Sequence, residues 1–252
     1  MTPRPVAPEG GFRTPEEQEV VQAYVRAFMN SKDPVEVRLA NFPKFVRRQD
    51  LTRLLALYEL FKKVLPVKGS VVDCGVYRGF SLMAWAHFSA ILEPTNLTRR
   101  IYGFDTFSGF PSVSEKDRST LRTPQRGELS SEAYEELLEL IRIYDRNRFL
   151  GHIPKVHLIR GDARETIPKF VQDNPHLVVS LLFLDFDLYE PTKVAIEHFV
   201  PRMPRGAVIA FDELDNPIWP GETQALLDTL GIGRLELRRL EWDPYIAYAL
   251  IP

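Results

Sequence analysis

Short apolar runs alternate with helical segments between residues 70 and 211, and this alternation organises most of the chain. The runs have the length of strands and are continuously apolar, as expected for strands that are buried on both faces. The pattern therefore predicts a doubly wound, parallel α/β sheet. Strands are expected near residues 70–74, 101–104, 156–160, 178–184 and 207–211, with helices near residues 80–92, 166–171 and 192–200.

The end of the chain follows a different pattern. Residues 234–242 and 245–251 are two strand-like runs on either side of Asp243-Pro244, and they predict an antiparallel hairpin. Five strand–helix units followed by such a hairpin is the order of elements in the seven-stranded, Rossmann-like sheet of class I methyltransferases. We therefore expect a main domain of this kind over residues 67–252.

Two amphipathic helices precede the first strand. Residues 1–13 are rich in proline and glycine and are expected to be disordered, and Thr14-Pro15-Glu16-Glu17 is a capping box that starts a helix. A second helix follows Asp50 and stops at Pro66. Their apolar positions recur at helical spacing (Val20, Val21, Tyr24, Val25 and Phe28; Leu51, Leu54, Leu55, Tyr58 and Phe61). Residues 1–66 therefore predict a helical cap or a subunit contact, which favours a homo-oligomer.

The alternation is interrupted between residues 108 and 149 by a polar loop and then a helix near 131–146. A loop of this length inside a compact domain is usually functional or disordered, and this one follows the second strand, at the edge where open α/β sheets bind ligands. A substrate lid and a plain surface insertion are about equally well supported. Four basic residues in it suit either a diphosphate clamp or a solvated surface (Lys116, Arg118, Arg122 and Arg126).

Composition restricts the classes of function. The 252 residues are 44% hydrophobic and 26% charged, with a formal net charge of −2, so no strong field attracts nucleic acid or an anionic membrane. A single cysteine excludes an intramolecular disulfide framework and a zinc site made of several cysteines. The sequence has no apolar segment of membrane-spanning length and no signal-peptide pattern, which favours a cytoplasmic protein whose partner is a small molecule.

Acids stand at the carboxyl ends of the first three expected strands. Asp73 ends the first, before a turn containing Gly75 and Gly79; Asp105 ends the second, and Asp162 follows the third. Each acid alone suits a helix N-cap, and the glycines alone suit tight packing. Together they indicate a ligand rich in hydrogen-bond donors, such as a nucleoside with ribose hydroxyls and an exocyclic amine.

A second group of acids follows the fourth and fifth strands. The segment LLFLDFDLYEPT carries Asp185 and Asp187, and GAVIAFDELD carries Asp212, Glu213 and Asp215. Carboxylates without histidine or cysteine select Mg²⁺, Ca²⁺ or Mn²⁺, and we favour a metal site made of Asp185, Asp212 and Glu213. Asp187 is interpreted as a helix cap before Pro191, and Asp215 as a turn residue.

Five segments taken together resemble the macrocin O-methyltransferase (TylF/MycF) family of metal-dependent sugar methyltransferases: VVDCGVYRGFS, IYGFDTFSGFP, GDARETIP, LDFDLYEPT and AVIAFDEL. The chain looks most similar to members that methylate a deoxysugar in antibiotic biosynthesis, and among them to nucleotide-linked rhamnose 3-O-methyltransferases of enediyne pathways. The resemblance implies S-adenosylmethionine and Mg²⁺ as cofactors. It also implies the 3-hydroxyl of dTDP-rhamnose as the acceptor, or else a sugar already attached to an aglycone.

The resemblance also implies residue roles. Asp105 would hold the ribose of S-adenosylmethionine, and Asp185 would be both general base and metal ligand, with Asp212 and Glu213 completing the Mg²⁺ site. The remaining cofactor contacts would be Gly75, Tyr77, Arg78 and Ser81 at the methionine part, Asp162 and Ala163 at the adenine, and Phe107. Glu213 departs from the family pattern, which has aspartate or asparagine there.

Three other classes compete with this interpretation. The sequence DFD also suits the D-x-D motif of a metal-dependent glycosyltransferase or of a phosphatase with an aspartyl nucleophile, and a non-catalytic cofactor-binding module is a third choice. The glycosyltransferase reading leaves Asp105, Asp162 and the glycine turn unexplained, and the phosphatase reading expects Thr or Val where Tyr189 stands.

Overall fold

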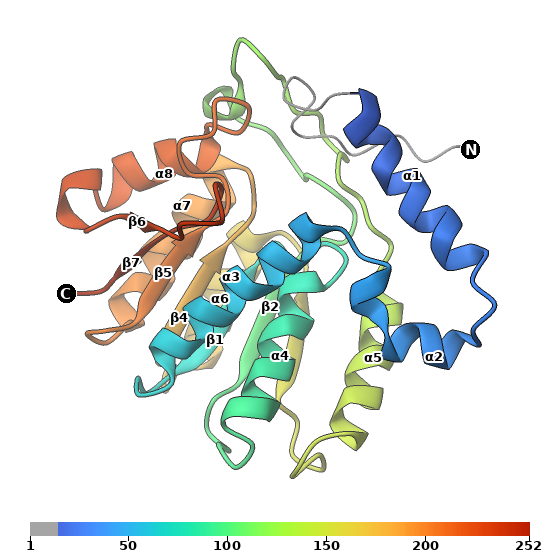
Figure 1. Cartoon of the computed structure of the whole chain (residues 1–252). Helices are drawn as coiled ribbons and strands as arrows, with labels where there is room; N and C mark the ends of the chain where they lie inside the picture. Colours follow the sequence, from blue (N-terminus) through green and yellow to red (C-terminus); the bar gives the residue numbers. More distant parts are fainter. Residues whose placement is uncertain (1–14) are drawn as a thin grey trace. The chain divides into compact units, whose positions relative to one another are not determined.

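The computed structural model describes residues 15–252, with side chains described from residue 19 onward. The expected disordered start and Thr14 of the capping box lie outside the described residues. The chain divides into two compact units, Met1–Leu55 and Ala56–Pro252 (Figure 1).

The first unit is helical. It contains α1 (Pro15–Met29), α2 (Val35–Ala40), the short 3₁₀ helix η1 (Phe42–Lys44) and the start of α3 (Arg48–Val64). The rings of Phe28 and Phe45 meet edge to face at 5.3 Å, and Arg38 donates to the carbonyl of Phe28 at 2.6 Å. The apolar face predicted for α1 remains partly exposed, because Val25 keeps half of its surface accessible.

The boundary between the units lies inside α3, whereas the sequence placed it after Pro66. The second half of α3 is buried at Leu57, Leu60 and Phe61, which belong to the core of the second unit, while Leu55 is 54% exposed. Phe61 stacks on Trp85 at 6.3 Å between ring centroids. This half of the helix therefore belongs with the sheet rather than with the cap.

The second unit is a seven-stranded sheet in the order β3-β2-β1-β4-β5-β7-β6. The strands β1 to β5 are parallel, and the terminal hairpin is antiparallel to them. Their bounds are β1 (Ser70–Cys74), β2 (Ile101–Asp105), β3 (Val156–Arg160), β4 (Val179–Leu184), β5 (Val208–Phe211), β6 (Arg238–Arg239) and β7 (Ala247–Leu250). The predicted fold class and the terminal hairpin are confirmed.

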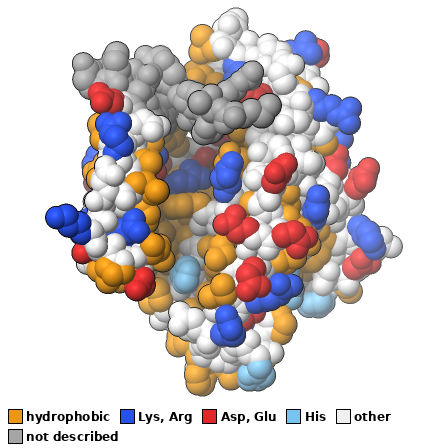
Figure 2. Space-filling model, turned by 90° about the vertical axis from the view of Figure 1, so that its right-hand side faces the viewer, with side chains coloured by type: hydrophobic (Ala, Val, Ile, Leu, Met, Phe, Trp, Pro, Cys, Tyr) orange, Lys and Arg blue, Asp and Glu red, His pale blue; other side chains and the backbone are white. Residues whose placement is uncertain are grey.

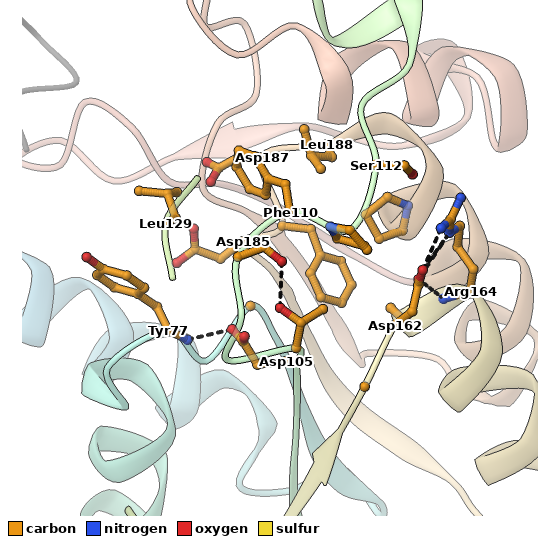
Figure 3. Close-up of a pocket in the computed structure, with 18 residues that line it drawn as sticks. Tyr77, Asp105, Phe110, Ser112, Leu129, Asp162, Arg164, Asp185, Asp187 and Leu188 are labelled. Atoms are coloured by element: carbon orange, nitrogen blue, oxygen red, sulfur yellow. Dashed lines mark hydrogen bonds and ion pairs between the residues drawn. The ribbon is translucent and has the colours of Figure 1, made fainter. Parts of the chain in front are cut away.

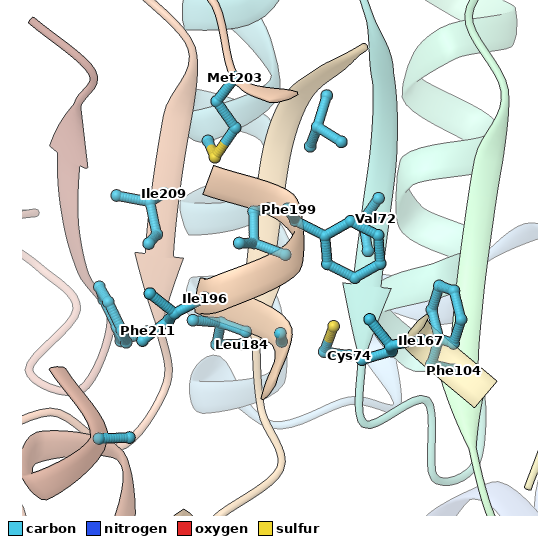
Figure 4. Close-up of a cluster of buried hydrophobic side chains, with 14 of the residues drawn as sticks. Val72, Cys74, Phe104, Ile167, Leu184, Ile196, Phe199, Met203, Ile209 and Phe211 are labelled. Atoms are coloured by element: carbon cyan, nitrogen blue, oxygen red, sulfur yellow. The ribbon is translucent and has the colours of Figure 1, made fainter. Parts of the chain in front are cut away.

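Helices cover both faces of the sheet (Figure 1). On one face α6 (Ala163–Asp173), α7 (Tyr189–Phe199) and α8 (Gly221–Thr229) enclose an apolar cluster, which Figure 4 shows around Phe199 and Leu184. On the other face α4 (Phe80–Leu92) packs Trp85 against Phe183 of β4 at 5.7 Å. The helix α5 (Tyr134–Arg146) reaches α4 through Tyr144, whose hydroxyl donates to the carbonyl of Ala86 at 2.7 Å.

Two helices were absent from the sequence prediction. They are α2, which buries none of its residues, and α8, whose nine residues follow a loop rich in proline. The helices α6 and α7 were predicted but begin earlier than expected, at Ala163 and Tyr189. The remaining short 3₁₀ turns are η2 (Glu115–Asp117), η3 (Val200–Arg202) and η4 (Ile232–Arg234).

The register of the central strands aligns their carboxyl ends. Cys74 pairs with Leu184, and Leu184 pairs with Phe211, so the residues that follow each strand emerge at one level of the sheet. The strand order reverses between β1 and β4, which is the topological switch point where open α/β sheets bind ligands. The expected neighbourhood of the first, fourth and fifth strands is thereby confirmed.

Acidic and basic side chains are interspersed on the side of the molecule shown in Figure 2, which agrees with the small net charge. Across residues 15–252, no helix combines the length and the apolar character needed to cross a membrane.

Candidate active site

A pocket opens at the carboxyl ends of β1 to β4 (Figure 3). Its walls come from the loops after these strands and from the insertion, which contributes Gly109 to Ser112 and Leu129. Six of the predicted site residues line it: Gly75, Tyr77, Asp105, Asp162, Ala163 and Asp185. Five other predicted site residues do not line it: Arg78, Ser81, Phe107, Asp212 and Glu213.

Gly75 allows the loops after β1 and β4 to approach closely. Its φ is +97°, and a Cβ built on it would lie 1.8 Å from the carbonyl oxygen of Asp185. The Asp185 amide in turn donates to the carbonyl of Cys74 at 2.8 Å. Any side chain at position 75 would therefore push these two pocket loops apart.

Asp105 fixes the shape of the turns beside it. One carboxylate oxygen accepts the N–H of Tyr77 at 2.7 Å, and the other accepts the N–H of Phe107 at 2.6 Å. Both residues have left-handed backbones, with φ of +51° and +57°, which is uncommon for side chains of this size. Burial raises the pKa of Asp105, and the backbone N–H groups oppose part of that rise.

Two of the predicted contacts are used for internal structure. Asp73 is fully buried, where it accepts the Ser81 hydroxyl at 2.9 Å and the indole N–H of Trp85 at 3.1 Å. The expectation that Asp73 joins Asp105 and Asp162 around a ligand is therefore wrong, because its carboxylate ties β1 to α4 inside the protein. Phe107 is 3% exposed and packs on Tyr134, with ring centroids 5.2 Å apart.

Arg78 lies on the surface beside the ring of Tyr77, with its guanidinium 5.3 Å from the ring centroid.

Asp162 combines two roles. Its side chain caps α6 by accepting the N–H of Arg164 at 3.0 Å, which confirms the N-cap interpretation, and it also lines the pocket. Burial alone would raise the pKa of Asp162, but hydrogen bonds from Arg164 bring it below its usual value. Sequence reasoning missed Arg164, although its guanidinium pairs with this carboxylate and it also lines the pocket (Figure 3).

Asp187 is not the helix cap that the sequence suggested. The N-cap position of α7 is Leu188, which supplies no side-chain bond, and the N–H of Tyr189 is instead held by Asp117 from the insertion at 2.6 Å. Asp187 has a left-handed backbone with φ of +62° and lines the pocket together with Asp185 (Figure 3). The turn role of Asp215 is confirmed, because its φ is +64° and its N–H donates to the Thr223 hydroxyl.

A further acid, Glu222, lies beneath the loops after β4 and β5. It is fully buried, and its oxygens accept the N–H groups of Asp187 at 3.3 Å and of Glu213 at 3.0 Å. Burial raises the pKa of Glu222 well above its usual value, and the carboxylates of Asp187, Asp212 and Glu213 raise it further. The only hint in the sequence is the segment PGETQALLDTL, a proline followed by helical spacing.

The three predicted metal ligands, Asp185, Asp212 and Glu213, lie at the same edge of the sheet, but their side chains are not grouped around one point. Asp212 is 7% exposed, and its N–H donates to Leu184, while the carboxylate of Glu213 accepts the side-chain amide of Asn216. Within residues 15–252, no three His, Cys, Asp or Glu side chains are arranged to share one metal ion. The donors have the chemistry that Mg²⁺ prefers, and they follow the neighbouring strands β4 and β5.

The basic residues of the insertion are mostly paired. Lys116 contacts Asp228 and donates to the Tyr189 hydroxyl at 3.0 Å, and Arg118 pairs with Glu115 at 3.0 Å. Arg122 pairs with Glu128 and lies 3.9 Å above the ring of Trp219. These side chains could bind a diphosphate only after their present ion pairs with Asp228, Glu115 and Glu128 were broken.

Comparison with known proteins identifies the family. The sequence profile of the macrocin O-methyltransferase (TylF) family matches residues 47–228. A crystal structure of the calicheamicin methyltransferase CalS11 is 39% identical, with a TM-score of 0.91 over 94% of this chain and 93% of that one. The apo structure of CalS11, described as a TDP-rhamnose 3'-O-methyltransferase, is 37% identical with a TM-score of 0.83, over 94% and 95% of the two chains.

A curated relative from Streptomyces olivaceus is 28% identical over 58% of this chain. It is the 8-demethyl-8-(2,3-dimethoxy-alpha-L-rhamnosyl)-tetracenomycin-C 4'-O-methyltransferase, and the match spans 53% of its length. The O-methyltransferase NovP, at 21% identity and a TM-score of 0.59 over 79% of each chain, supports the fold. The family match sets aside the glycosyltransferase, phosphatase and non-catalytic alternatives. The chain belongs to the macrocin O-methyltransferase family, and it is an O-methyltransferase with the class I S-adenosylmethionine-dependent methyltransferase fold.

Proposed function

We propose that this protein transfers a methyl group from S-adenosylmethionine to the 3-hydroxyl of dTDP-rhamnose or a closely related nucleotide-linked deoxysugar. The observation that carries the proposal is the likeness to CalS11, which extends over more than nine-tenths of both chains at 37–39% identity. The pocket at the carboxyl edge of the sheet supplies carboxylate acceptors and a backbone turn that suit the nucleoside of the cofactor.

The proposed cofactor contacts use residues that line the pocket. The carboxylate of Asp105 accepts the ribose hydroxyls, Asp162 and Ala163 meet the adenine, and the backbone at Gly75 and Tyr77 lies against the methionine part. The bound cofactor supplies an activated methyl group on a sulfonium. Replacing Asp105 by Asn should raise the dissociation constant for S-adenosylhomocysteine about tenfold by calorimetry, since it removes acceptor positions and leaves backbone N–H groups poorly matched.

In the proposed reaction, Asp185 accepts the proton of the attacking sugar hydroxyl. The oxygen–methyl bond forms as the methyl–sulfur bond breaks, and the sulfonium becomes a neutral thioether, so the charge is balanced by proton release to the carboxylate. The protein contributes mainly by holding the two reactants in line, an effect of roughly 7–11 kcal/mol in well-oriented models. Asp185→Asn should fold and bind S-adenosylhomocysteine but lose turnover; near-normal activity would overturn this assignment.

Mg²⁺ dependence is part of the proposal, with Asp185, Asp212 and Glu213 as the ligands. It is supported by the donor chemistry and by the gathering of carboxylates near Glu222, which a cation would neutralise. Such an ion would act as a Lewis acid on the sugar hydroxyls. Titration of metal-free protein with Mg²⁺ and with Ca²⁺ by calorimetry, with an Asp212→Asn variant as control, tests binding separately from activity.

The deciding experiment is incubation with S-adenosylmethionine, Mg²⁺ and dTDP-rhamnose, with mass spectrometry to detect one added methylene and EDTA to remove the metal. A second acceptor class, a rhamnose already joined to an aglycone, is favoured by the name of the tetracenomycin relative. A rhamnosylated aglycone is therefore the matched competing substrate. Methylation of this compound alone would contradict the nucleotide-linked proposal.

We also infer a homo-oligomer. In the first unit, Met29, Leu39 and Val35 are exposed by 68%, 62% and 51%, which is unfavourable for apolar side chains left in water. Light scattering coupled to size-exclusion chromatography would give the mass, and a monomer at micromolar concentration would contradict the inference.

A further inference from the structure

Glu222 connects two loops that carry the pocket acids. It is the second residue of α8, it is fully buried, and its carboxylate lies between the segment after β4 and the segment after β5. One oxygen accepts the Asp187 N–H at 3.3 Å, and the other accepts the Glu213 N–H at 3.0 Å.

The connection begins where the sheet ends. The last pair of the β4–β5 ladder is Leu184 with Phe211, and the Asp212 N–H still donates to Leu184 at 2.9 Å. The regular β4–β5 ladder ends there. Farther along these two segments, Glu222 accepts the N–H groups of Asp187 and Glu213, so its side chain bridges the loops that follow the paired strands.

The start of α8 is built to come this close. A Cβ on Gly221 would lie 2.6 Å from Asp117 Oδ1, 2.6 Å from the Tyr189 nitrogen and 2.8 Å from the Asp187 carbonyl oxygen. Only glycine therefore lets the helix approach the loop after β4 and bring Glu222 under it. The strained backbone of Asp187, with φ of +62°, is held in place by this contact.

The choice of glutamate is informative because the surroundings are acidic. Asp187, Asp212 and Glu213 all raise the pKa of Glu222, so an apolar residue would be the better choice if filling space were the only requirement. Glutamine has the same shape but offers one acceptor oxygen and one amino group, and the amino group would face an N–H. Each oxygen of the Glu222 carboxyl group can accept one of the two N–H groups, which the amide of glutamine cannot do.

We propose that Glu222 is a positioning residue for methyl transfer, which fixes the loop of Asp185 to Asp187 against the loop of Asp212 and Glu213. The inference rests on the proposed role of Asp185 as the proton acceptor. Glu222 itself is fully buried and does not line the pocket, so it would act through these two loops. Its loss should affect the alignment of the reactants more than the binding of the cofactor, which is held on the loops after β1 to β3.

Glu222→Gln is the test variant, and Thr223→Ala is its matched control. Thr223 is the next residue of α8 and accepts the Asp215 N–H at 2.9 Å, farther out on the same loop. In Glu222→Gln we expect kcat to fall at least tenfold, while the KM for S-adenosylmethionine and the dissociation constant for S-adenosylhomocysteine stay within threefold. Thr223→Ala should keep wild-type kcat. An unchanged kcat in Glu222→Gln, or an equal loss in Thr223→Ala, would overturn the proposal.

A measurement on the wild-type chain separates this inference from the proposed substrate. In amide hydrogen exchange, the N–H groups of Asp187 and Glu213 should exchange slowly although they lie beyond the ladder, and those of Glu222→Gln should exchange at least tenfold faster. Failure to methylate any rhamnose acceptor would reject the proposed function. The exchange measurement would then still test whether Glu222 holds the two loops together. Fast exchange of either N–H group in the wild-type protein rejects the role of Glu222.

Discussion

Asp117 caps the helix that begins at Tyr189. Its Oδ1 accepts the Tyr189 N–H at 2.6 Å, and its Oδ2 accepts the Ser114 N–H at the same distance. The carboxylate is 2% exposed, so a residue of the insertion serves as the buried N-terminal partner of a core helix. The start of the insertion is therefore fastened to α7, next to the pocket residue Leu188.

Replacing Asp117 by Asn should destabilise the protein and loosen the insertion. The amide retains one acceptor oxygen, so one of two buried N–H groups loses its partner, which costs about 1–3 kcal/mol. Urea denaturation measures the change in the free energy of unfolding, and limited proteolysis should show new cleavage within residues 108–132. The control is Glu115→Gln, because this side chain of the same turn is 83% exposed. Equal stability of both variants would contradict the capping role.

Gly75→Ala tests the contact between the loops after β1 and β4. The added Cβ would overlap the carbonyl oxygen of Asp185, and alanine disfavours the φ of +97°. We expect the dissociation constant for S-adenosylhomocysteine to rise more than tenfold by calorimetry, with a lower melting temperature. Gly233→Ala is the control, since no atom lies within 4 Å of its Cβ position. Wild-type affinity in Gly75→Ala would show that the close approach is unnecessary for the cofactor.

Replacing Arg118 and replacing Arg122 should have different effects, because Arg118 forms an exposed ion pair whereas Arg122 packs on Trp219. Arg118→Ala removes an exposed ion pair and should leave the KM for a nucleotide sugar unchanged. Arg122→Ala removes the cation–π contact with Trp219 and the pairing with Glu128, and should lower the free energy of unfolding by about 1–2 kcal/mol. Steady-state kinetics and denaturation measure the two effects. A KM raised tenfold by Arg118→Ala would restore the diphosphate clamp.

The central sheet could be predicted because its signal is local. Continuous apolar runs such as residues 179–184 have few alternatives to a buried strand, and the acids that follow them must emerge at one edge. The neighbourhood of Asp185 and Asp212 follows from strand order alone. The place of Gly75, Asp105 and Asp162 in the pocket could also be predicted, because each lies at the carboxyl end of a parallel strand.

The errors concern contacts between segments far apart in the sequence. The partners of Asp73 are on α4, the cap of Tyr189 comes from the insertion, and the role of Glu222 depends on a helix that the sequence did not predict. An acid before a helix gives the same local pattern whether it caps that helix, lines a pocket or is enclosed in the core. Only tertiary packing distinguishes these outcomes for Asp73 and Asp187.

Lys155 is the buried cation with the clearest consequence for pH dependence. It is 4% exposed, and its ammonium donates to the carbonyl of Asn96 at 3.0 Å. Burial lowers the pKa of Lys155 to about 8; Glu93 opposes the shift, and nearby arginines add to it. In the unfolded chain a lysine titrates at about 10.4.

The stability of the protein should therefore rise with pH between about 8 and 10, because the unfolded state binds more protons than the folded state in that interval. Below pH 8 the folded state carries the full penalty of this buried charge. Urea denaturation at pH 7.5 and 9.5 gives the slope of the unfolding free energy against pH. The contribution of Lys155 is the difference in this slope between the wild type and Lys155→Met. The control, Lys169→Met, removes an equal charge from a side chain that is 75% exposed and should leave the slope unchanged. If the unfolding free energy of Lys155→Met depends on pH as steeply as that of the wild type, burial does not lower the pKa of Lys155, and the prediction is wrong.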